Sequence, residues 1–225
     1  MSRVILLVLC TGAILGGALL LQSTAVPGRT EPNEAESHQP TDSKAYASRL
    51  SDVQKKILAG AKSQLENPAS YSGAYYKISY PNGDPPADRG ACTDVVVRAL
   101  RHAGFDLQQL IHEDSKVNNY PRIQSRDSNI DHRRCPNQSR FFARHGLTLT
   151  LNPQMRSEWQ PGDIVFWKLD NQLDHVGVLS DKISRSGDLL VVHNIGPHVK
   201  EEDVLRSWKI VGHFRFPPPP IAPSP

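Results

Sequence analysis

The sequence predicts an α+β domain in which N-terminal helices pack on a small antiparallel sheet. Apolar residues in the first half recur at the three- and four-residue spacing of helices that bury one face. In the second half the period changes, and short apolar runs follow turn signals at close intervals, which is typical of antiparallel strands. The chain has 225 residues and no visible internal repeat, which is enough for one sizeable domain with tails.

The N-terminus predicts export. Residues 1–25 combine a short basic start with an apolar run, and Ser23 and Ala25 place small residues at the spacing that a signal peptidase needs. The run is also near the length that spans a bilayer, so the alternative is an uncleaved anchor that attaches the chain to the membrane. Either way, we expect the body of the protein in the periplasm or the cell envelope.

Three further segments complete the expected domain organisation. Residues 26–45 are rich in Pro, Glu, Ser, Thr and Gln and have almost no apolar content, which predicts a disordered linker. Residues 46–217 form the folded domain. Residues 218–225 form a proline-rich, extended tail.

The helical half contains one helix before the central cysteine and two after it. The first is amphipathic and starts near Ser51 or Asp52. Clustered tyrosines at residues 75–80 predict a short strand, and a long polar stretch at 118–137 predicts an irregular loop. The three helices are expected at residues 46–65, 105–114 and 139–146.

The stretch at residues 88–104 predicts a tight loop that delivers Cys92 to the first turn of a helix. Gly90 permits close approach of the backbone, and Gly104 stands where a C-terminal cap is expected. A cysteine at a helix N-terminus faces unpaired N–H groups and the positive end of the helix dipole, which favour its thiolate. The stretch is therefore a candidate nucleophile site, and a small buried residue closing a loop is the alternative interpretation.

The sheet half places two histidines where they could serve that cysteine. His175 begins one predicted strand and His193 ends the next, so an antiparallel hairpin would set them side by side, facing Cys92. A cysteine nucleophile needs a base to take its proton, and the base needs a third group to orient it. The four strands are expected at residues 164–167, 174–179, 188–193 and 210–216.

These motifs, in this order, resemble the pattern of NlpC-type cell-wall cysteine peptidases, which have a papain-like fold. The pattern comprises a cysteine that opens a helix, a Pro-Gly-Asp strand at 160–167, a His-Val-Gly strand at 174–179 and a polar residue, here His193, that ends the next strand. The chain more closely resembles an uncharacterised bacterial family in that group, domain of unknown function 1287, over about residues 61–217. The similar blocks lie at residues 80–84, 92–96, 112–114, 129–134 and 193–196.

The resemblance implies an amide hydrolase that cuts peptide bonds in peptidoglycan stems and needs no cofactor. Cys92 would attack the carbonyl, His175 would act as base and His193 would orient His175, with Asn194 as the competing orienting residue. The backbone N–H of Cys92 and a neighbouring donor would hold the oxyanion. A tyrosine before the cysteine often assists in such enzymes, and Tyr80 or Tyr76 is the candidate here.

The chain departs from the general pattern around the nucleophile. The relatives usually have Asp-Cys-Ser there, whereas this chain has Ala91 before Cys92 and an aspartate, Asp94, after it. The block at 131–134 is an addition near the expected cleft, where Arg133 and Arg134 could bind substrate carboxylates or form a salt-bridged structural loop. The residues expected to bind substrate are Tyr80, Asp94, His132, Arg133 and Arg134.

Other interpretations remain open. Asp131, His132, His175 and His193 could bind zinc in a metal-dependent hydrolase, although no metal-binding spacing supports this and we expect no metal site. A non-catalytic wall-binding module could use the same groove. The exported chain would keep Cys92 and Cys135, which could pair as a disulfide and remove the nucleophile.

The charge of the chain excludes one class of partner. The net charge is +3, but no block of Lys and Arg is interleaved with aromatic residues. We therefore expect no nucleic-acid partner. A mild basic excess is compatible with an anionic polymer such as peptidoglycan.

Overall fold

The computed structural model describes residues 50–219, and within them the helices are segregated from the strands of the main sheet and precede most of them, which makes this an α+β domain. Residues 1–49 and 220–225, which include the predicted signal or anchor, the linker and most of the tail, lie outside the described residues. No helix within residues 50–219 is long and apolar enough to cross a membrane. The helices are α2 (Asp52–Ser63), α3 (Cys92–His102), α4 (Leu107–Asp114) and α5 (Cys135–His145), with 3-10 turns η1 (Asp131–Arg133) and η2 (Arg156–Glu158).

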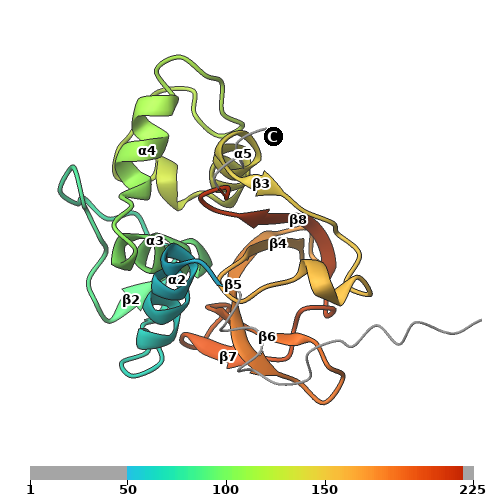
Figure 1. The fold of residues 1–225 in the computed structure, drawn as a ribbon. Helices are drawn as coiled ribbons and strands as arrows, with labels where there is room; N and C mark the ends of the chain where they lie inside the picture. Colours follow the sequence, from blue (N-terminus) through green and yellow to red (C-terminus); the bar gives the residue numbers. More distant parts are fainter. Residues whose placement is uncertain (1–49, 220–225) are drawn as a thin grey trace, which may run out of the picture. The chain divides into compact units, whose positions relative to one another are not determined.

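The main sheet has six strands in the order β3-β8-β4-β5-β6-β7, and all neighbours are antiparallel. Strands β4 to β7 follow one another as a meander, whereas β8 returns to pair with the other side of β4 (Figure 1). The four predicted strands are present, and the structure adds β3 and β7. The strands are β3 (Leu147–Thr148), β4 (Ile164–Lys168), β5 (Asp174–Ile183), β6 (Leu189–His193), β7 (Lys200–Glu202) and β8 (Lys209–Arg215), with a separate parallel pair of β1 (Ser70–Tyr71) and β2 (Arg89–Gly90).

Both faces of the sheet are buried, which explains the continuously apolar strands. Successive side chains of a strand point to opposite faces. Ile164 and Phe166 of β4 therefore join the core under the helices, whereas Val165 and Trp167 join a second core on the other face. The helices α2 and α3 pack on β5 from the first side and lie beside each other (Figure 1). Their close approach depends on Gly60, where a Cβ would lie 2.4 Å from the Cβ of His102.

Local sequence signals account for the helix starts. The Ser51 hydroxyl accepts the Gln54 N–H at 3.2 Å and begins α2, as expected. The last helix begins at Cys135, four residues earlier than predicted. Pro136 lies in its first turn, where a backbone N–H has no partner within the helix, so the lack of one in proline costs no hydrogen bond.

The predicted strand at residues 75–80 is wrong, because these residues have no regular structure. Their polar groups bind loops and a helix instead of another strand. The Tyr75 hydroxyl donates to Asp127 at 3.0 Å, and the Ile78 N–H donates to Asn129 at 2.9 Å. The tyrosines are anchored through their hydroxyls, which a strand pattern does not reveal.

Candidate active site

Cys92 is the first residue of α3, as predicted, and only 8% of its surface is exposed. Its helix begins there because Asp94 reaches back and accepts the Ala91 N–H at 2.6 Å. The same carboxylate also holds the loop before the cysteine in place. The thiol thus lies at a fixed helix N-terminus, where unpaired N–H groups favour a negative charge.

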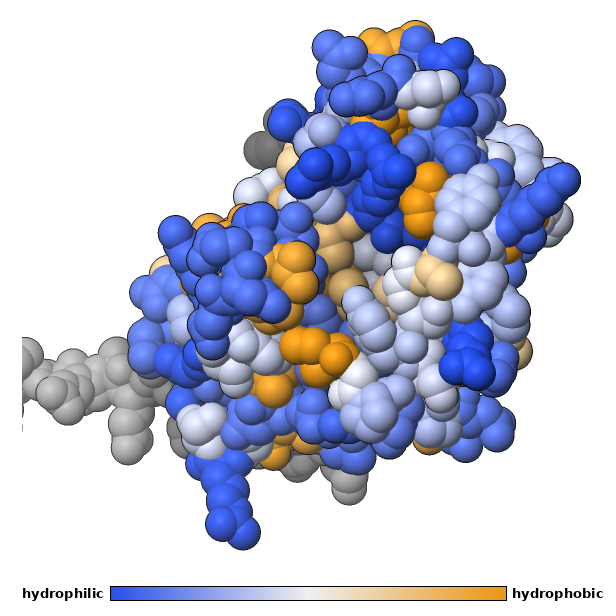
Figure 2. Space-filling model, turned by 180° about the vertical axis from the view of Figure 1, so that it is seen from behind, coloured by the Kyte–Doolittle hydropathy of each residue, from blue (hydrophilic) through white to orange (hydrophobic). Residues whose placement is uncertain are grey.

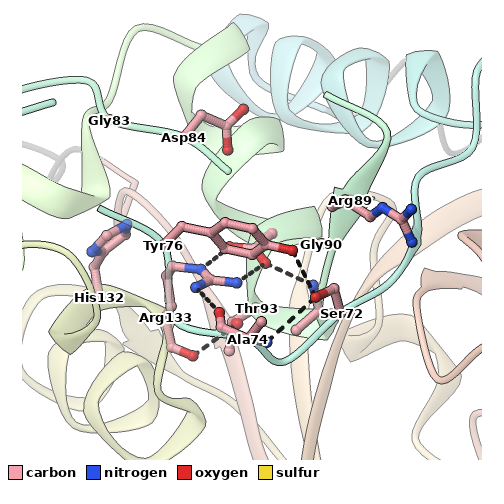
Figure 3. Close-up of polar contacts among 12 residues, drawn as sticks. Ser72, Ala74, Tyr76, Gly83, Asp84, Arg89, Gly90, Thr93, His132 and Arg133 are labelled. Carbon is pink, nitrogen blue, oxygen red and sulfur yellow. Dashed lines mark hydrogen bonds and ion pairs between the residues drawn. The ribbon is translucent and has the colours of Figure 1, made fainter. Parts of the chain in front are cut away.

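Asp94 is itself held by Arg133 in a buried, two-pronged ion pair. Arg133 Nε donates to one carboxylate oxygen at 2.7 Å, and Nη2 donates to the other at 2.9 Å. The third nitrogen donates to the Ala74 carbonyl at 2.9 Å, and the Tyr76 ring covers the guanidinium (Figure 3). Both residues were candidates for binding substrate, but their charged groups bind each other. The geometry favours the alternative of a salt-bridged structural loop for this pair.

His175 and His193 lie side by side in the hairpin of β5 and β6. His193 pairs with Gly177, so His175 stands two residues along the same face of β5. His175 Nε2 and His193 Nδ1 are 2.9 Å apart, and both rings are buried. The Trp208 ring packs edge-on against both imidazoles. The hairpin therefore places the two histidines as the sequence predicts.

A fourth residue, Glu202, extends this chain of contacts and was not predicted. His193 Nε2 lies 3.1 Å from Glu202 Oε2. Glu202 belongs to β7, whose three charged residues show no apolar period, so the strand left no ordinary signal in the sequence. Gly196 and Pro197, which mark the turn after β6, are the one feature that could have indicated a returning strand.

The two cysteines of the described chain face each other as free thiols. Their sulfur atoms are 3.7 Å apart, well beyond the roughly 2.05 Å of a disulfide. Each opens a helix, and side-chain bonds join those two helix starts. The Thr93 hydroxyl donates to the Arg133 carbonyl at 2.9 Å, and the Gln138 amide donates to the Thr93 carbonyl at 3.1 Å.

The surroundings shift the pKa values of the two thiols in opposite directions. Hydrogen bonding with Cys135 has the largest effect on Cys92 and lowers its pKa; burial opposes this, and His175 lowers the pKa further. The net pKa of Cys92 is well below its ordinary value, whereas bonding to Cys92 and burial raise that of Cys135. Of the two thiols, Cys92 is therefore the one that loses its proton more readily.

The family of the chain follows from comparison with known proteins. The profile of the family described as DUF1287, a domain of unknown function, matches residues 58–216. The chain belongs to the DUF1287 family. The predicted resemblance to this family is confirmed, and the site described above lies within the matched residues.

Individual proteins similar to this DUF1287 chain include one curated relative and solved structures. An uncharacterized protein, YijF of Escherichia coli (strain K12), is 49% identical over 167 residues, which cover 71% of this chain and 80% of the relative. Two crystal structures of an N-acetylmuramoyl-L-alanine amidase from Bacteroides uniformis ATCC 8492 match with 13% identity and TM-scores of 0.45 and 0.44. They cover 73% and 72% of this chain and 99% and 98% of their own.

Asn194, the competing orienting residue of the DUF1287 chain, binds backbone rather than His175. Its amide donates to the Ala69 carbonyl at 3.1 Å and to the Gly90 carbonyl at 2.9 Å. These bonds tie the end of β6 to the loop before Cys92. Asn194 therefore has a structural place beside the site, and His193 has the position next to the His175 ring.

The tyrosine placed near the thiols is Tyr71, which the sequence did not single out. Its backbone pairs with Gly90, and its phenol pKa is raised first by burial and then by negative charge on Cys92. Tyr80 instead lies against α4, where its hydroxyl donates to Glu113 at 3.1 Å and its ring is 5.0 Å from His112. Tyr76 covers Arg133.

The remaining residues of the 131–134 block are dispersed. His132 is buried, and neither of its ring nitrogens has a hydrogen-bond partner within the described part of the chain. Arg134 donates to the Arg122 carbonyl. Among residues 50–219, no group of three or more His, Cys, Asp and Glu side chains is arranged to hold a metal ion, so the alternative set of Asp131, His132, His175 and His193 is not assembled.

A cavity of about 360 Å³ opens beside the thiols. Cys135 forms part of its wall from α5, Trp167 contributes from β4, and Asp174 contributes from β5, where it precedes His175. Its size falls at the lower end of ordinary ligand pockets. Figure 2 shows the side of the molecule opposite to Figure 1, where near-neutral and hydrophobic side chains gather in a hollow within a hydrophilic rim.

Proposed function

We propose that this DUF1287 domain is a cysteine amidase or endopeptidase that hydrolyses amide bonds in the stem peptides of peptidoglycan. The observation that carries the proposal is the series His175, His193 and Glu202, whose side chains lie at hydrogen-bond distance from one another, beside Cys92, whose pKa His175 lowers. A helix-borne cysteine opposite histidines on a sheet is also the papain-like arrangement that the motifs imply. The resemblance of the motifs to cell-wall peptidases supports peptidoglycan as the substrate, and the apolar N-terminal run supports a place in the cell envelope.

The hydrogen-bond chain assigns the tautomer of each histidine. A carboxylate only accepts, so His193 Nε2 carries a proton toward Glu202. Burial, more than the charge of His175, lowers the pKa of His193 to about 4, which keeps this ring neutral near pH 7. Its Nδ1 therefore accepts from His175 Nε2–H. This leaves His175 Nδ1 as the nitrogen with a free electron pair for the thiol proton.

Hydrolysis then needs only groups that this site supplies. The Cys92 thiol passes its proton to His175 Nδ1, and the thiolate attacks the amide carbon to form a tetrahedral oxyanion. The N–H groups at the start of α3 can stabilise that charge. The C–N bond breaks as His175 returns the proton to the leaving nitrogen, which yields a thioester on Cys92. Water gives a proton to His175 and displaces the sulfur, which releases a carboxylic acid and restores the thiolate.

Digestion of purified peptidoglycan by the purified chain, with products identified by mass spectrometry, tests the proposal. We expect peptide fragments with new carboxyl and amino ends. Cys92→Ala should abolish the release, and His175→Ala should slow it by roughly 10²–10⁴-fold. His102→Gln, which changes an exposed histidine, should leave the rate unchanged.

The same assay separates the alternatives. Loss of activity with a chelator, but not with Cys92→Ala, would identify a metal-dependent hydrolase. Binding of the chain to sacculi without release of fragments would identify a wall-binding module. Recovery of the chain in the cytoplasmic fraction of its host would contradict the proposed location.

A further inference from the structure

The wall of the cavity beside Cys135 carries an exposed arginine, Arg140. Its guanidinium makes no hydrogen bond or ion pair with any residue in the described range 50–219, so it is available to a ligand. Ser139, its neighbour on the same wall, likewise has no side-chain hydrogen bond within that range. A free guanidinium next to a hydroxyl in a hollow is suited to a planar anion, because it can donate two parallel hydrogen bonds to a carboxylate.

The one acidic side chain on the wall does not neutralise Arg140. Asp174 is paired with Lys168, with its Oδ1 2.6 Å from the lysine nitrogen. That pair leaves the positive charge of Arg140 unopposed. The remaining lining is mostly apolar and comprises Pro121, Pro136, Ala143, Phe166, Trp167 and Val211. A mostly apolar pocket with a few polar groups is the common form of a small-ligand site.

The cavity adjoins the reacting groups from two directions. Cys135 on its wall is 3.7 Å from the Cys92 sulfur, and Trp167 pairs with His175 across the sheet. Arg140 follows Cys135 by five positions in α5, a rise of about 7.5 Å along the helix. That is about the length of two extended peptide residues. A chain bound with its carbonyl at Cys92 would therefore bring a group about two residues away to Arg140.

We propose that Arg140 binds a free carboxylate of the substrate about two residues from the scissile amide. The preferred substrate would thus be an acidic stem peptide in which that carboxylate is neither amidated nor linked. The inference rests on the proposed function, since it names the substrate class of the same site. Binding of the carboxylate, however, does not require the thiol to react.

The experiment compares two synthetic stem tripeptides that differ only in a free carboxylate or a carboxamide on the C-terminal residue. For the wild-type chain, we expect kcat/KM to favour the carboxylate by roughly 10–100-fold, the range for a hydrogen-bonded charge. Arg140→Gln should reduce this preference to about one, and Arg140→Lys should keep part of it because lysine retains charge without the two-pronged geometry. The matched control is Arg185→Gln on an exposed turn, which should keep the full preference.

Binding to the Cys92→Ala variant, measured by calorimetry, makes the result independent of catalysis. Tighter binding of the carboxylate peptide that Arg140→Gln abolishes supports the inference even if neither peptide is cut, in which case the proposed hydrolysis is the part that fails. Hydrolysis with equal kcat/KM for both peptides, or an unchanged preference in Arg140→Gln, overturns the inference and leaves the hydrolase proposal standing.

Discussion

His175 Nε2 and His193 Nδ1 are 2.9 Å apart, so the two imidazoles act as one hydrogen-bonded unit. The pair is asymmetric, because His193 is also next to Glu202 and is held neutral by burial. The asymmetry decides which nitrogen of His175 carries the proton. A proton on His175 would be stabilised by the acceptor on His193 and, beyond it, by the carboxylate.

We expect Glu202→Gln to slow hydrolysis without unfolding the protein. The glutamine can present its amide N–H to His193 Nε2, which would reverse the tautomer and turn His193 Nδ1 into a donor facing His175. Loss of a charge-assisted hydrogen bond predicts a fall in kcat of roughly 10-fold or more. Glu66→Gln, at an exposed position, is the control. Full activity in Glu202→Gln would show that Glu202 does not contribute to the function of the histidine pair.

Cys135 should set the pKa of Cys92. A thiol that donates to a thiolate favours the charged form, so Cys135→Ala should raise the pKa of Cys92 toward its ordinary value. Cys135→Ser keeps a donor and should raise it less. The pH dependence of alkylation measures this, with Cys92→Ala identifying the labelled residue. Identical alkylation profiles for the wild type and Cys135→Ala would contradict the assigned roles of the two thiols.

The Asp94–Arg133 pair should contribute to stability rather than to substrate binding. Asp94→Asn leaves a buried guanidinium without its counter-charge, for which about 3–5 kcal/mol of unfolding free energy is expected to be lost. Urea denaturation measures the change, with Asp52→Asn, at an exposed carboxylate, as the control. If Asp94→Asn kept normal stability but had a raised KM for acidic peptides, Arg133 would be a substrate-binding residue instead.

Acid should destabilise the protein through its buried histidines. Burial lowers the pKa of His132 to about 4, whereas the unfolded chain takes up this proton near 6.5. Between these values the unfolded state binds more protons, so stability falls as the pH falls, by up to about 3 kcal/mol for His132. His193 is shifted in the same direction.

Replacement of His132 with an apolar residue separates its share of this effect. His132→Leu should flatten the decline in stability from pH 6.5 to pH 4 by about half, because His193 still titrates. Thermal unfolding across that pH range is the measurement, and His102→Gln, at an exposed histidine, should leave the profile as it is. A decline as steep in His132→Leu as in the wild type would mean that carboxylates dominate the acid response.

Sequence patterns could predict those parts of the site that local rules govern. Helical spacing after Gly90 placed Cys92 at a helix start, and the adjacency of two strands placed His175 beside His193. Both are short-range consequences of hydrogen-bonded periodicity, which a single sequence displays.

The structure was needed where partners come from distant segments. The aspartate of the Pro-Gly-Asp motif, Asp163, binds His213 at 3.0 Å and Arg215 at 2.7 Å, so it joins the start of β4 to β8.

By itself, the sequence determined the α+β order of elements, the helix that begins at Cys92 and the hairpin that carries both histidines, because each depends on residues near one another in the chain. Only the tertiary structure decided that Cys135 contacts Cys92, that Arg133 forms an ion pair with Asp94 and that Glu202 contacts His193. Those contacts arise from the packing of whole elements against each other, and packing leaves no local period in the sequence.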